Sequence, residues 1–130
     1  MAADRKILKA LKSAIGYLDN SMPALDRKDE NSLADSIWHV AAELEYVLFL
    51  FSITFKDEAD KSKWKLNPKL KKNELGPTLA TVQDLLNDTE KCIKNEKLLD
   101  AYKNAYIARH YILKVQKEFA RKKREALKKK

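Results

Sequence analysis

A chain of 130 residues is long enough to bury one hydrophobic core and suits a single domain. It has only two glycines and three prolines, which argues against a fold built on turns and predicts an all-α chain. Its net charge of +8 favours anionic partners. The single cysteine, Cys92, excludes an intrachain disulfide and fits a reducing, cytoplasmic setting. Lysine and glutamate are frequent and glutamine is rare, a thermophile-like composition.

The first helix is expected over residues 4–19. Asp4 suits its N-cap, and apolar residues recur at helical spacing on one face. No secretory signal is expected, because these first residues are charged and amphipathic. Residues 20–30 contain Pro23 and are expected to be a connection with at most one helical turn. The apolar stripe of this first helix comprises Ile7, Leu8, Leu11, Ile15 and Leu18.

The second helix, residues 32–56, is the element around which the chain is organised. Ser32 and Asp35 have the spacing of a capping box. The C-terminal half is apolar on every side, so we expect it to be buried all round. Its longest apolar run, 46–55, is too short to cross a bilayer, which needs about 20 residues, so no membrane span is expected. The core face comprises Leu33, Ile37, Val40, Leu44, Val47 and Phe51.

A long basic loop is expected to follow, then helices at about 77–94 and 96–127. Four helices with mainly short connections predict a single-domain up-and-down bundle over residues 1–120. Residues 121–130 form a basic C-terminal extension of the last helix. Each half of the chain pairs a shorter helix with a longer one, but no tandem period is visible, and we interpret the likeness as coincidence.

Two segments carry most of the positive charge. Residues 61–72 have six lysines and no acid, and 121–130 have seven basic residues and one acid. They contribute +6 each, so the rest of the chain carries −4. Such clusters attract nucleic acid, although solvated tails, anionic membranes and acidic proteins fit the same charges. The residues predicted to contact RNA or DNA are Lys61, Lys63, Trp64, Lys65, Lys69, Lys71, Lys72, Arg121, Lys122, Lys123 and Arg124.

Trp64 stands between two lysines in the basic loop. Its ring offers a surface on which a base could stack. The alternative is that Trp64 packs on the core together with Leu66 and Leu70.

Arg109 interrupts an apolar arc of the last helix. A buried guanidinium must be paired, and Glu43 and Glu45 of the second helix are the expected partners. An ion pair that fixes the helix register is the main interpretation, and an anion-binding site is the alternative. No catalytic residue, metal ligand or cofactor is predicted.

Two helices have more than one apolar face. Surplus apolar surface usually marks a partner site, and a homodimer is the commonest solution. The predicted function is therefore a small non-enzymatic binding or assembly module. A protein–protein accessory subunit and an enzyme or anion-binding protein built on Arg109 and Glu43 are the alternatives. The predicted self-association residues are Tyr46, Phe49, Leu50, Ile53, Ile107, Tyr111 and Val115.

Overall fold

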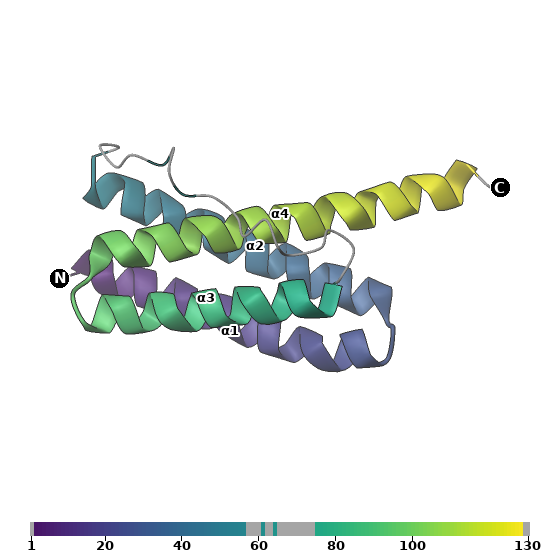
Figure 1. Ribbon diagram of the computed structural model, residues 1–130, viewed down its shortest axis with the longest axis horizontal. Helices are drawn as coiled ribbons and strands as arrows, with labels where there is room; N and C mark the ends of the chain where they lie inside the picture. The colour runs from purple at the N-terminus through teal and green to yellow at the C-terminus, as the bar shows by residue number, and fades with distance from the viewer. Residues whose placement is uncertain (1, 57–60, 62–63, 65–74, 129–130) are drawn as a thin grey trace.

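The computed structural model describes residues 2–56, 61, 64 and 75–128 of the chain. Within these residues the fold is a bundle of four helices, which confirms the predicted all-α class (Figure 1). The helices are α1 (Ala2–Asp26), α2 (Glu30–Thr54), α3 (Leu75–Lys94) and α4 (Leu98–Lys128).

The order of the helices around the bundle is α1, α2, α4, α3, and every neighbouring pair is antiparallel (Figure 1). An ion pair joins Glu45 of α2 to Arg109 of α4, and a second joins Glu30 to Lys122, which fixes the antiparallel register. Helices α2 and α3 lie diagonally opposite and run in the same direction. Their connection therefore joins opposite ends of the bundle, which explains why it is long.

Helix α1 continues to Asp26, so the prediction that it ends near residue 19 is wrong. Pro23 lies inside the helix, close to its end. It lacks the N–H that would bind the Asp19 carbonyl, so α1 loses one hydrogen bond three residues before its end. Ser21 and Ala24 are buried in this last part, and that tertiary packing holds the segment helical.

Helix α2 begins two residues earlier than predicted, and its cap is Asp29 instead of Ser32. The Asp29 carboxylate accepts hydrogen bonds from the backbone N–H of Ser32 (3.2 Å) and from the Ser32 hydroxyl (2.9 Å). These bonds hold the pKa of Asp29 below its usual value. Asp29 therefore occupies the N-cap position, and Ser32, three residues later, donates the hydrogen bonds that the cap accepts.

We expect Asp29→Ala to lower the melting temperature by roughly 3–5 °C at pH 7, the effect of one lost cap in a domain of this size. Because the folded-state pKa is lowered, the stabilisation is present above the unfolded value of 3.8. It is lost as the pH falls through the folded pKa. Thermal melts of the variant and of Asp26→Ala, a neighbouring exposed acid, check this. An equal loss in both variants would contradict the cap.

The chain folds as two helical hairpins whose turns have the same geometry. Both turns place one residue in the left-handed region, Lys28 (φ 57°) and Glu96 (φ 61°). The next residue donates its N–H to a carbonyl five positions back in each turn, from Asp29 to Ala24 and from Lys97 to Cys92. The offset between the hairpins is 68 residues, from 28 to 96.

The same offset relates the two halves of the core. The hairpins pack with α1 antiparallel to α3 and α2 antiparallel to α4, as an approximate two-fold axis requires. Side-chain sizes differ between the halves and few of the residues are identical, so no repeat is visible in the sequence. The equivalent buried pairs are Ala10 and Thr78, Leu11 and Leu79, Ala14 and Val82, Leu18 and Leu86, Ser21 and Thr89, Leu33 and Ala101, Ile37 and Ala105, Val40 and Ala108, Leu44 and Ile112, and Val47 and Val115.

Helix α2 is buried on one face only, which corrects the prediction for its C-terminal half. The predicted core face is fully buried, but Tyr46, Phe49 and Ile53 are exposed on the other side. By length and composition α2 could also cross a membrane, a test that core helices pass as well. In the bundle its buried face packs against α1 and α4.

Candidate functional site

The outer face of α4 carries a line of basic side chains. All are exposed and lie within about 80° of one another around a helix that turns 100° per residue. The line is roughly 37 Å long at 1.5 Å per residue. We call it the basic strip, and it comprises Lys103, Lys114, Lys117, Arg121, Arg124 and Lys128.

The sequence around the basic strip explains why it faces outward. The core positions of α4, such as Ala105, Ile112 and Val115, occupy the opposite side of the helix. Beyond residue 119 every described side chain of α4 is exposed, and the helix extends past the other three (Figure 1). Positive charges on this face therefore meet solvent and any ligand that approaches the helix.

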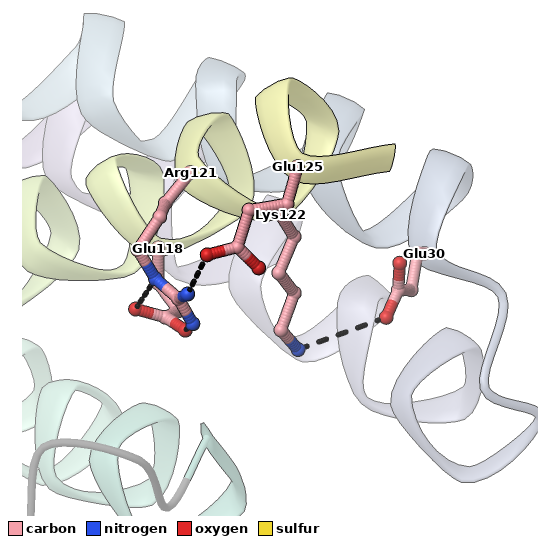
Figure 2. Close-up of polar contacts among 5 residues, drawn as sticks. All are labelled: Glu30, Glu118, Arg121, Lys122 and Glu125. Carbon is pink, nitrogen blue, oxygen red and sulfur yellow. Dashed lines mark hydrogen bonds and ion pairs between the residues drawn. The ribbon is translucent and has the colours of Figure 1, made fainter. Parts of the chain in front are cut away.

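Arg121 and Lys122, two of the predicted contacts, form ion pairs within the protein (Figure 2). Arg121 donates hydrogen bonds to Glu118 and Glu125, which together raise the pKa of its guanidinium. Lys122 lies 3.8 Å from Glu30 at the start of α2. Within the part of the chain that the structure describes, Lys103, Lys114, Lys117, Arg124 and Lys128 of the basic strip form no ion pair.

Only two of the predicted loop residues lie within the described part of the chain. Trp64 is half-buried and packs edge-on against Tyr102 and Tyr106, with ring centroids 5.1 and 5.4 Å apart. The ammonium of Lys61 lies 5.4 Å from the Tyr102 ring centroid. Trp64 thus takes the alternative role of core packing. Lys63, Lys65, Lys69, Lys71 and Lys72, like Leu66 and Leu70, lie outside the described residues.

His110 lies on the same face of α4 as the basic strip, between Lys103 and Lys114 along the helix. Its ring contacts Tyr106 at a centroid distance of 4.5 Å. Partial burial lowers the pKa of His110, and the neighbouring charges of Arg109, Lys114 and Lys117 lower it further. At neutral pH the imidazole is therefore mainly uncharged, and the positive potential here comes from the lysines.

Arg109 pairs with Glu45, one of its two predicted partners, but the pair is not buried. The Nε–H group of Arg109 donates to a Glu45 carboxylate oxygen, and their side chains are 28% and 54% exposed. A pair in such contact with water contributes at most about 1 kcal/mol. Among the described residues, Arg109 and Glu43 share no ion pair. The contact ties α4 to α2 and gives little support to an enzyme or anion site built on Arg109 and Glu43.

The predicted self-association residues divide into two groups. Tyr46, Phe49 and Ile53 are exposed on α2, as a partner surface requires. Tyr111 and Val115 are buried between α4 and the rest of the core, so their assignment to a second surface was wrong. Leu50 and Ile107 are half-buried against the core. The second apolar face of α4, which includes Tyr111 and Val115, is apolar because it packs inside the bundle.

Cys92 lies in the last turn of α3, beside a shallow polar pocket of about 360 Å³. Burial raises the pKa of its thiol, and the carboxylates of Asp100 and Asp88 raise it further. The Asn104 amide lies 3.9 Å from the sulfur. The thiol is therefore protonated at neutral pH. Across residues 2–56, 61, 64 and 75–128, no three His, Cys, Asp or Glu side chains gather closely enough to hold a metal ion.

The basic strip was missed because charge was sought in continuous runs. Its residues are separated by 11, 3, 4, 3 and 4 positions, a pattern that plotting α4 as a helix would have revealed. Comparison of the chain with protein-family models, with curated proteins and with solved structures finds no match.

Proposed function

We propose that this protein is a non-enzymatic binding module that holds a polyanion, single- or double-stranded nucleic acid, along the outer face of α4. The observation that carries the proposal is the basic strip, in which six exposed cations follow one helix face. Nucleic acids present phosphates at regular spacing, and each phosphate neutralised by Lys or Arg releases counterions.

The internal repeat supports a specific role for this charge. The positions of α2 that correspond to Lys114, Lys117 and Arg121 are Tyr46, Phe49 and Ile53, so the fold accepts either basic or apolar side chains on this face. The positive charge on α4 is therefore a property of this surface and not a requirement of the fold. A second candidate function, assembly with another protein, rests on that apolar face of α2.

The test is fluorescence anisotropy with single-stranded RNA and duplex DNA at several salt concentrations. With five unpaired cations engaged, log K should fall with log salt at a slope of roughly −3.5 for single strands and −4.5 for duplex. Affinity should then drop by roughly 100- to 500-fold between 50 and 200 mM salt. The proposal fails if no complex forms at about 50 mM salt, or if affinity does not depend on salt.

A further inference from the structure

The exposed side of α2 carries a continuous row of apolar side chains. They lie directly opposite the core face of the helix, within about 80° of one another, and extend over roughly 22 Å. The four large side chains are between 45% and 60% exposed. We call this surface the apolar stripe, and it comprises Trp38, Ala42, Tyr46, Phe49 and Ile53.

Nothing in the fold requires this surface to be apolar. The equivalent positions of α4, 68 residues later, are Tyr106, His110, Lys114, Lys117 and Arg121. Large aromatic side chains have areas of 150–250 Å² each, so the apolar stripe exposes several hundred Å². A patch of this size on a single chain marks an interaction site.

The arrangement of the apolar stripe is self-complementary. When two copies of α2 lie antiparallel about a two-fold axis between residues 45 and 46, residue i faces residue 91 − i. Trp38 then faces Ile53 of the second copy, Ala42 faces Phe49, and Tyr46 faces Glu45 at the centre. A small side chain opposite a large one allows the helices to approach closely.

The charges at the two ends of the apolar stripe select the same orientation. Asp35 lies on its line at one end, Lys56 follows the other end two residues after α2 stops at Thr54, and both are exposed. Antiparallel packing brings Asp35 near Lys56 of the second copy. A parallel arrangement would place like charges together, which is unfavourable.

We propose that a second copy of this chain covers the apolar stripe, through antiparallel packing of α2 against α2 in this register. The contact is isologous, so it closes as a dimer and each copy contributes the same residues. The positions of the apolar stripe recur every three or four residues, as in helices that pack side by side at a small crossing angle. The dimer carries two basic strips, which raises avidity for a long polyanion.

Sedimentation equilibrium of the full chain at micromolar concentration, without nucleic acid, tests the proposal independently of the proposed function. The expected mass is twice the 15.0 kDa of one chain. Phe49→Glu should shift the protein to a monomer with unchanged helical circular dichroism. Leu127→Glu, the same kind of change at an exposed leucine outside the apolar stripe, should leave the dimer intact.

A charge swap tests the register. Asp35→Lys and Lys56→Asp should each weaken the dimer by roughly tenfold or more, because each places two pairs of like charges across the interface. The double variant should restore it. A monomer at every concentration, a dimer that Phe49→Glu does not affect, or a double variant that stays weak would overturn the proposal. Binding of monomers to vesicles of anionic lipid through the apolar stripe would do so too.

Discussion

Tyr102→Ala should cost roughly 3–5 kcal/mol in the free energy of unfolding, the range for removing a large buried ring. Tyr102 is 1% exposed. It stacks on Phe51 at a centroid distance of 5.1 Å and on Phe55 at 5.7 Å, and the Trp64 ring meets its edge. Truncation therefore leaves a cavity where α2, α4 and residues Phe55 and Trp64, which follow α2, converge. A loss of this size lowers the melting temperature by roughly 11–18 °C for 130 residues.

Two variants sharpen this prediction. Tyr102→Phe keeps every ring contact and should stay within about 1 kcal/mol of the parent. Tyr106→Ala removes a half-buried ring that touches Trp64 and His110, and should cost clearly less. Urea unfolding followed by circular dichroism gives all three free energies. A free-energy cost for Tyr102→Ala below about 2 kcal/mol would contradict this prediction, because that is less than the loss expected for a large buried ring.

The fold class and the core faces could be predicted because apolar residues that recur at helical spacing mark the buried face of a helix. The face of α2 from Leu33 to Phe51 was read correctly from spacing alone. Helix ends were harder, because Pro23 looks like a terminator until the burial of Ser21 and Ala24 is known. Asp29 and Ser32 both suit an N-cap, and only the observed hydrogen bonds decide between them.

The surfaces were less predictable for a different reason. A row of apolar residues on a predicted helix does not indicate whether another helix of the same chain covers it. Tyr111 and Phe49 both sit on second apolar faces, yet Tyr111 is buried and Phe49 is exposed. Tyr111 lies one helical turn from Ala108 and Val115, at the edge of the buried face of α4, whereas Phe49 lies opposite the buried face of α2.

Neutralising Lys114 and Lys117 together should weaken nucleic-acid binding by roughly 25- to 60-fold at 0.1 M salt, with the larger loss for duplex. The estimate assumes that each lysine neutralises one phosphate, which contributes about 0.7 to the salt slope for single strands and 0.9 for duplex. Both lysines are exposed on the basic strip and form no ion pair among the described residues. Lys114→Gln/Lys117→Gln therefore removes charge without breaking a contact of the fold.

The matched control is Lys9→Gln/Lys12→Gln. These two lysines are exposed on α1, which lies diagonally across the bundle from α4. Both double variants lower the net charge by the same amount, so a general effect of charge would weaken them equally. Anisotropy titrations from 50 to 200 mM salt should show a slope reduced by about 1.4–1.8 for the α4 variant alone. Equal slopes in the two variants would mean that the polyanion follows the charge of the whole protein, and the assignment to α4 would be wrong.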